Sequence, residues 1–447
     1  MNSCRTKFFA KAAMGMLITV LLSQPLFAGG FSIYEQGARA TAQAGAITAR
    51  PWDASAAFYN PAGLSMFGTP GQWRIYGGIT PVQSLSKFQG LNPSPGIGVT
   101  DKAKDQVFYP FHFYTVYNIN EKMAAAIAFT VPFGLGTFWD DPNYSGRFRS
   151  IKAEIQTVHI SPTFSYKFND KFSVGASLDY VYSKVTLRRN NPQPFFDGTH
   201  TIVYDVAQVN LKGTNDFSMG WHLAAFYQID EKWSVGADYK HLLHNKYSGT
   251  AKFKQILTGN PVVDASVTST LNNAAFGGLS QDGNTQVNTP NSIALGVGYK
   301  HSEKWNVGFD FQYVGWSTFK QVYIEFPDNH VSPSSLLEEN YDDTWQIRLG
   351  GEYWFNDKFA GRLGYIYDHT PAPTETVNPL LPDANRNDLS IGVGYKLTDA
   401  LHVDAAYMAV LFNERSTKGK NVDKYDGIYQ SHVNLFSLSV GYAFGGK

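Results

Sequence analysis

Apolar and polar side chains alternate over long stretches of the chain. Between 305 and 313 one set consists of Trp305, Val307, Phe309, Phe311 and Tyr313, and the other of Asn306, Gly308, Asp310 and Gln312. The segments 344–355 and 436–444 alternate in the same way. A period of two with one consistently apolar side predicts β-strands that have one apolar and one polar face.

A short signature recurs six times between these strand-like segments. Each copy has a tyrosine, two further residues, a polar turn former, an acidic residue, usually a lysine, and a large apolar residue. The polar centre predicts a tight turn with a strand on either side. The copies are YNINEKM (117–123), YKFNDKF (166–172), YQIDEKW (227–233), YKHSEKW (299–305), YWFNDKF (353–359) and YKLTDAL (395–401).

Alternation alone is compatible with a soluble sandwich, so the connections decide the architecture. The six turns are short, whereas the segments near 191–214 and 248–287 are long, and we expect them to be irregular loops. Short turns on one side and long loops on the other are typical of an outer-membrane barrel, with the aromatic residues at the turns forming an interfacial girdle. We therefore predict an all-β fold, a 14-stranded antiparallel transmembrane β-barrel. Its strands lie near 72–84, 106–118, 123–133, 152–168, 172–188, 216–228, 233–247, 290–300, 305–318, 343–355, 358–369, 387–397, 401–412 and 432–444.

Composition agrees with this class and excludes others. Aromatic residues make up 15% of the chain and charged residues only 17%, with 41 glycines. Lys+Arg and Asp+Glu balance at 37 each, which argues against a nucleic-acid partner. The single cysteine, Cys4, lies in a segment that we expect to be removed, so we expect neither disulfides nor a cysteine metal site.

The first 28 residues have the features of a signal peptide. Basic residues precede the apolar run from Ala12 to Leu22, which is too short to span a bilayer, and Ala28 stands at the expected cleavage site. Leu26 is larger than is usual at its position, so the cut is defined only to within a residue or two. The chain is therefore predicted to consist of a signal peptide (1–28), an N-terminal segment (29–71) and a barrel (72–447).

The N-terminal segment is predicted to be a helical hatch that plugs the barrel. It has nine alanines between Ala38 and Ala57, in a spacing that suits neither a strand nor a lipid-facing surface. Small residues allow short helices to pack closely, and Asn60-Pro61 ends them with a turn. A flexible leader is the alternative, although it would hardly need Trp52, Phe58 and Phe67. We expect Arg39 or Arg50 to pair with a lumenal carboxylate, the candidates being Asp179, Asp238, Asp310, Glu352 and Asp404.

Two stretches carry a resemblance to a known family. The segment 29–67, GGFSIYEQGARATAQAGAITARPWDASAAFYNPAGLSMF, resembles the hatch of the long-chain fatty acid outer-membrane transporters, the FadL type, which includes relatives that take up toluene and xylene. The hatch motif is Asn60, Pro61 and Ala62. The segment from Phe129, FTVPFGLGTFWDDPNYSGRF, is similar to the family's third strand and the loop after it. The chain departs from the family by ending Gly445-Gly446-Lys447 rather than on an aromatic residue.

The resemblance implies transport of hydrophobic solutes such as long-chain fatty acids. Ligand would be captured at extracellular loops, bind a lumenal pocket beside the hatch, and leave through a lateral gate at a kinked third strand. Pro132 lacks an N–H group and, with Gly134 and Gly136, would break strand pairing there. The predicted ligand-binding residues are Phe31, Phe133, Lys184, Arg188, Phe195 and Phe196.

Other functions stay open at this point. Uptake of neutral aromatic hydrocarbons is an alternative, because Lys184, Arg188 and Arg189 could contact lipopolysaccharide phosphates instead of a ligand carboxylate. A general diffusion porin and a passive surface barrel are further alternatives. An enzyme is not expected, since no G-x-S-x-G, Walker loop or H-E-x-x-H motif occurs. We expect no catalytic residues, metal or cofactor, and a monomer whose partners are hydrophobic small molecules, outer-membrane lipid and lipopolysaccharide, and the barrel assembly machinery.

Overall fold

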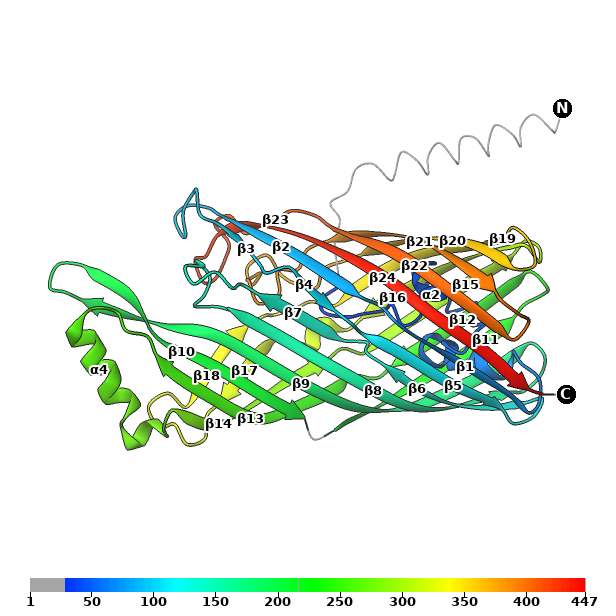
Figure 1. Cartoon of the computed structure of the whole chain (residues 1–447), viewed down its shortest axis with the longest axis horizontal. Coiled ribbons are helices and arrows are strands. Elements are labelled where there is room, and N and C mark those ends of the chain that lie inside the picture. Colours follow the sequence, from blue (N-terminus) through cyan, green and yellow to red (C-terminus); the bar gives the residue numbers. More distant parts are fainter. Residues whose placement is uncertain (1–28, 216, 447) are drawn as a thin grey trace, which may run out of the picture.

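The computed structural model describes residues 29–215 and 217–446, so the predicted signal peptide lies outside the described residues. The strands form one long antiparallel barrel, and the N-terminal segment lies inside it (Figure 1). The prediction of a closed 14-stranded barrel is confirmed. Within the described ranges, no helix is long and apolar enough to cross a membrane.

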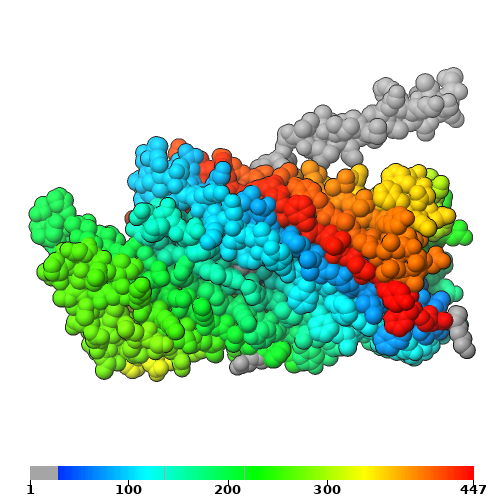
Figure 2. Space-filling model, viewed as in Figure 1, coloured from blue at the N-terminus to red at the C-terminus, as the bar shows by residue number. Residues whose placement is uncertain are grey.

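Neighbouring strands pair in sequence order, and the last strand closes the ring against the first. The register between β1 and β24 runs from Gln72↔Gly445 to Ile79↔Leu438. Figure 2 shows the red end of the chain lying along the blue first strand. Closure leaves no free sheet edge, as a barrel in a membrane requires.

Several of the fourteen barrel strands are interrupted and appear as two shorter elements. The first half of the barrel contains β1 (Gln72–Ile79), β2 (Val82–Gly90), β3 (Thr100–Lys102), β4 (Gln106–Phe108), β5 (Phe111–Asn118), β6 (Met123–Thr130), β7 (Gly134–Phe138), β8 (Lys152–Lys167), β9 (Phe172–Phe196), β10 (Thr201–Asn215), β11 (Ser218–Gln228), β12 (Trp233–Lys240) and β13 (Leu243–Gln255). The second half contains β14 (Ser280–Thr289), β15 (Ser292–Lys300), β16 (Trp305–Val314), β17 (Gln321–Glu325), β18 (Ser334–Glu338), β19 (Thr344–Trp354), β20 (Phe359–Asp368), β21 (Arg386–Lys396), β22 (Leu401–Phe412), β23 (Arg415–Ser416) and β24 (Gly427–Gly445).

The barrel has apolar side chains on its outer surface and polar side chains inside, which is the reverse of the distribution in a soluble protein. Along β16, Phe309 is 44% exposed, whereas its neighbour Asp310 is 1% exposed. The apolar face of each alternating strand therefore points outward and the polar face points into the lumen. This is the arrangement expected of a barrel surrounded by lipid.

The expectation of irregular loops near 191–214 and 248–287 is wrong for most of their length. β9 and β10 form one long hairpin through these residues, and β13 and β14 pair beside it. Only the centre is helical, in α4 (Pro261–Leu271) and η2 (Ala274–Phe276). These hairpins project beyond the rest of the barrel with α4 at their tip (Figure 1). The strands in these hairpins have polar residues on both faces. They therefore lack the consistently apolar face from which the other strands were predicted.

The N-terminal segment is built from short helical turns buried in the lumen. These are α2 (Ala38–Thr41), α3 (Ala56–Tyr59) and η1 (Pro61–Ser65). All nine alanines between Ala38 and Ala57 are buried, because their small side chains let backbone approach the barrel wall closely. The predicted ion pair is confirmed: Arg39 binds Glu352 of β19, at 2.9 Å between Nη2 and Oε1.

Candidate functional site

The third barrel strand is broken where Pro132 was expected to break it. β6 ends at Thr130 with β5 on one side and β8 on the other. β7 begins at Gly134 and, among the described strands, pairs with β8 alone. At the far end, the Lys104 amide donates to the Phe138 carbonyl at 2.7 Å. A window therefore lies in the barrel wall between residues 106–112 and 131–137.

The N-terminal segment supplies the missing hydrogen bonds at this window. The Ile33 amide donates to the Pro132 carbonyl at 2.8 Å, and the Gly134 amide donates to the Phe31 carbonyl at 3.1 Å. The Gln36 side chain completes the set: its Nε2 donates to the Val131 carbonyl at 2.8 Å, and its Oε1 accepts from the Val131 amide at 3.1 Å. Residues 31–36 thus satisfy backbone groups that would otherwise be unpaired.

A cavity of about 380 Å³ lies behind the window. Apolar side chains make up much of its lining, including Phe31, Ile33, Val82, Phe108, Val131, Phe133, Ile155, Leu381, Val410 and Phe412. Phe108 of the second strand covers the position of Gly136, where an added Cβ would lie 1.9 Å from the ring. Ile33 covers Gly134 in the same manner, with its Cδ1 2.8 Å from an added Cβ. The two glycines leave room for these side chains at the window.

An aromatic cluster lies beside the cavity. The Phe31 ring lies 4.7 Å from Trp316, 5.6 Å from Phe319 and 6.2 Å from Phe133 between ring centroids, in edge-to-face geometry. Gly30 has a φ of +68°, and an added Cβ would lie 2.6 Å from the Trp316 ring. Glycine is therefore needed at this position to bring Phe31 into the cluster.

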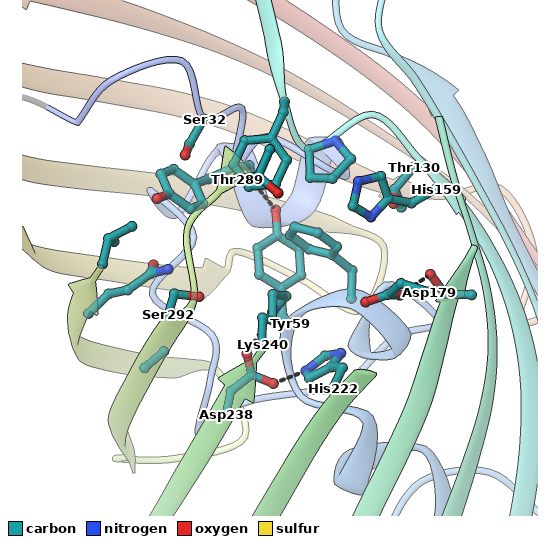
Figure 3. Close-up of a pocket in the computed structure, with 18 of the residues that line it drawn as sticks. Ser32, Tyr59, Thr130, His159, Asp179, His222, Asp238, Lys240, Thr289 and Ser292 are labelled. Carbon is teal, nitrogen blue, oxygen red and sulfur yellow. Dashed lines mark hydrogen bonds and ion pairs between the residues drawn. The ribbon is translucent and has the colours of Figure 1, made fainter. Parts of the chain in front are cut away.

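A second, smaller cavity of about 60 Å³ lies on the other side of Ser32 and Phe133, and polar and charged side chains form a larger share of its lining (Figure 3). His222 contacts Asp238, whose Oδ2 accepts from Lys240 at 2.6 Å. The Lys240 ammonium also lies 4.7 Å from the centre of the Phe58 ring. The Tyr59 hydroxyl donates to the Tyr34 carbonyl at 2.5 Å. The more apolar lining of the first cavity suits an apolar ligand that stays there.

Charged groups border the apolar cavity at the start of the N-terminal segment. Arg386 donates to Asp368 at 2.7 Å and lies 3.3 Å from Asp388. Asp383, in the loop before β21, accepts from the Gly30 amide at 3.2 Å. Burial raises the pKa of Asp383 to about 7, and burial also raises the pKa of Glu35 in the N-terminal segment.

The Asn60-Pro61-Ala62 motif contacts the barrel wall through its backbone and one amide side chain. Asn60 Nδ2 donates to the Thr48 carbonyl at 2.7 Å and to the Ala225 carbonyl at 3.1 Å. Pro61 occupies the first turn of η1, and the Ala62 carbonyl accepts from the hydroxyls of Ser165 and Ser173. These contacts fix the end of the N-terminal segment to β8, β9 and β11.

The predicted site residues fall into two groups. Phe31, Phe133, Pro132, Gly134 and Gly136 come together at the cavity and its window. Lys184 and the pair Phe195 and Phe196 line neither cavity, because Lys184 lies on the outer face of β9 and Phe196 is 64% exposed on the projecting hairpin. Phe195 packs near Val206 and Val263 instead. Arg188 lines a separate pocket of about 40 Å³ with Arg149 and Arg189.

Sequence reasoning missed several residues that shape the site. Phe108 and Arg386 line the cavity, and Gln36 and Trp316 contact the lining residues Val131 and Phe31. Each of the four is isolated in the sequence from the others. The Gly29-Gly30 pair, which brings the backbone against Trp316, was the one local signal available. Among residues 29–215 and 217–446, no group of His, Cys, Asp and Glu side chains has the geometry of a metal site.

The family model described as "Outer membrane protein transport protein (OMPP1/FadL/TodX)" matches residues 19–444. The long-chain fatty acid transport protein of Escherichia coli O6:H1 is 23% identical over 466 residues, covering 98% of this chain and 99% of the relative. The structure of a Pseudomonas aeruginosa FadL homologue superimposes with a TM-score of 0.77 at 22% identity, covering 94% of this chain and 99% of that one. The Ralstonia pickettii toluene transporter TbuX gives a TM-score of 0.66 at 18% identity, covering 90% and 97%.

Proposed function

The chain belongs to the outer membrane protein transport protein family of FadL and TodX, and from this premise we propose that it moves hydrophobic small molecules through the apolar cavity and out between its second and third strands. As a member of this family it is a β-barrel of the outer membrane, of the type that transports hydrophobic compounds. The relatives named above are transport proteins rather than enzymes.

One observation carries the proposed route: the apolar cavity ends at the window where the third strand lacks its partner. An apolar ligand gains about 0.8 kcal/mol for each methylene group that leaves water, so release into an aqueous compartment would be costly. A window in the barrel wall would let the ligand pass from the cavity directly into the bilayer. Phe108 and Ile33 fill the window through side chains, which can rotate without breaking the strands on either side.

In this proposal residues 29–71 act as the hatch. Their short helices occupy the lumen below the cavity, and their contacts with β19, β9 and β11 keep the direct path to the periplasm filled. The projecting hairpins of β9, β10, β13 and β14 would provide the surface at which ligand is first captured.

A neutral aromatic hydrocarbon is a second candidate ligand, and the charges at the cavity favour it. The lining includes Glu35 and Asp383, and the one arginine there, Arg386, already pairs with Asp368 and Asp388. A fatty carboxylate in this cavity would meet carboxylates rather than a free cation. Uptake assays with oleate and with an alkylbenzene of known partition coefficient would rank the two ligand classes.

A reversible crosslink across the window tests the route. Cysteines at Phe108 and Gly136, joined by a short reducible bis-thiosulfonate reagent, should hold the second and third strands together. We expect uptake to fall to the level of cells without the protein and to recover after reduction. Cysteines at Thr115 and Ile127, which already face each other in the paired part of the same two strands, form the matched control. Normal uptake by the crosslinked Phe108–Gly136 protein would exclude the lateral route.

A further inference from the structure

A buried cluster of charged groups near Gly29 has one more carboxylate than it has guanidinium groups. Arg386 lies in electrostatic range of Glu35, Asp368, Asp383 and Asp388. The other guanidinium groups in range are those of Arg348 and Arg415. The four carboxylates are each at most 8% exposed, so when all four are ionised water compensates little of the excess negative charge.

Three carboxylate oxygens of this cluster have no hydrogen-bond donor: both oxygens of Asp388 and one of Asp368, which is the one nearest Gly29. Oδ2 of Asp368 accepts from Gln346 and Arg386, whereas Oδ1 is buried without a partner. A Cβ added to Gly29 would lie 2.7 Å from this Oδ1 and 2.6 Å from Oδ2. The Asp368 carboxylate therefore points at the backbone of Gly29. A buried, ionised oxygen without a donor is costly unless a cation or donor comes to it.

The next residue contacts a second carboxylate of the cluster. The Gly30 amide donates to Oδ2 of Asp383, which also accepts from the Thr370 hydroxyl. The backbone of Gly29 and Gly30 thus lies between Asp368 and Asp383. Neither position can hold a larger residue, since Asp368 fills the space beside Gly29 and Trp316 fills the space beside Gly30.

We infer that the mature chain begins at Gly29 and that its α-ammonium group binds in this cluster, against Asp368 and beside Asp383. Cleavage of the bond between Ala28 and Gly29 by signal peptidase converts a neutral amide into a cation. That cation supplies the missing positive charge and donors for the unpartnered oxygen of Asp368. Removal of the signal peptide thus creates a new ion pair at the chain end. This ion pair adds to the hydrogen bonds that hold residues 29–36 at the window. The inference does not depend on the proposed transport route.

The first test measures where the mature chain begins and how its amino group reacts. Intact mass of the protein purified from outer membranes should correspond to a chain that starts at Gly29. Mild acylation followed by trypsin then reports on the amine through the peptide 29–39. We expect the amine of the folded protein to react about tenfold or more slowly than that of the unfolded protein, because a carboxylate within 4–6 Å keeps the ammonium form charged.

Two variants separate ion pairing from simple shielding. Asp368→Asn combined with Asp383→Asn keeps the shape of the site, and the amine should then react nearly as fast as in the unfolded protein. Asp105→Asn, at an exposed aspartate, is the control and should leave the slow rate unchanged. A slow rate in the double variant would mean that packing alone shields the amine, and would overturn the inference.

A third variant keeps every carboxylate and moves only the chain end. Inserting Ala-Gly after Ala28 lengthens the mature chain by two residues and should raise both the reactivity of the amine and the hydrogen exchange of residues 30–36. Heat-modifiable migration in gels would verify that the barrel is folded in each variant. A mature chain that begins elsewhere than at Gly29, or unchanged exchange in the lengthened chain, would contradict the inference.

Discussion

Arg39 of the N-terminal segment donates two hydrogen bonds to Glu352 of β19, from Nε to Oε2 at 3.0 Å and from Nη2 to Oε1 at 2.9 Å. The same carboxylate accepts a hydrogen bond from Nε of Arg362 at 2.7 Å. Arg362 also donates from Nη1 to Oδ1 of Asp404 at 2.6 Å. Both carboxylates and Arg362 are almost fully buried. The N-terminal segment is therefore joined to an ion network that is part of the barrel wall.

Glu352→Gln should loosen the N-terminal segment more than Arg39→Gln does. The first change leaves two guanidinium groups without their shared carboxylate, which costs about 3–5 kcal/mol for a buried pair, whereas the second leaves Glu352 with Arg362. Chymotrypsin cleavage after Trp52 and hydrogen exchange of residues 38–59 would report the loosening. Lys102→Gln removes only an exposed ion pair, worth about 0–1 kcal/mol, and is the control. Equal effects of the two lumenal variants would contradict the network.

Glu339 should make the stability of the extracellular side depend on pH. Its carboxylate is 1% exposed and accepts from Asn378 Nδ2 at 3.1 Å, and burial raises its pKa from 4.5 to about 8. Between these values the folded protein keeps a proton that the unfolded chain loses, so stability is greatest below about pH 4.5, falls as pH rises, and levels off above about 8. The total fall is at most about 5 kcal/mol.

The measurement is protease resistance of residues 319–343 between pH 5 and 9. Wild-type protein should become more sensitive as pH rises through this interval. In Glu339→Gln the dependence should disappear, because the amide does not titrate. Glu338→Gln, at the exposed neighbouring residue, should retain it. A profile that is unchanged in Glu339→Gln would show that another group controls it.

Gln36→Ala should open the window. The substitution leaves the Val131 amide and carbonyl without their partners, at a cost of about 1–3 kcal/mol. We expect faster hydrogen exchange at residues 31–36 and 131–134, and increased entry of small apolar dyes into cells. Gln89→Ala replaces an exposed glutamine of β2 and should change neither. Unaltered exchange at residues 131–134 would mean that Ile33 and Gly134 hold the window without Gln36.

The strands could be predicted from the sequence because their determinants are local. Period-two alternation and the six turn signatures involve neighbouring residues, and they gave the order and number of strands. The hairpins at 190–215 and 243–289 were not predicted, because they lie where neither face contacts lipid and neither face is therefore consistently apolar. The residues that complete the site could not be found locally. Gln36 and Val131 are 95 residues apart, and Phe31 meets Trp316 only after the barrel closes.

The charge or aromatic character of a residue does not by itself show whether its side chain faces the lumen. Phe31 and Phe133 were assigned from the resemblance, and the structure brings them to the cavity. Lys184 was assigned from its charge and its place near the end of a strand, but a change of one position along a strand reverses the face of a side chain. Ser183 and Val185 face inward beside it, so Lys184 faces outward. Basic residues near strand ends need the register before they can be assigned to a ligand.

Regularising the third strand should close the window while the barrel still assembles. If the register of Phe113↔Phe129 continued, it would place Phe111 opposite Val131 and Phe108 opposite Gly134. The triple change Pro132→Thr, Gly134→Thr and Gly136→Val restores the missing N–H and adds β-branched side chains that favour this pairing. It also removes the space that Phe108 and Ile33 now occupy, since added Cβ atoms would overlap both side chains. The second and third strands should then pair along their whole length.

The expected phenotype separates binding from transport. The lining from Phe31, Val82 and Val410 is untouched, so a fluorescent apolar ligand should still bind purified protein. Uptake by cells should fall to background, because the cavity no longer reaches the bilayer. Ala125→Thr, a change of the same kind in the paired part of the third strand, should leave uptake normal and shows whether β-branching alone is harmful. Normal uptake by the triple variant would place the outlet elsewhere, past a displaced N-terminal segment. Loss of binding together with uptake would mean instead that Phe108 and Ile33 had been forced into the cavity, and the smaller variant Pro132→Thr would then isolate the effect of the restored ladder.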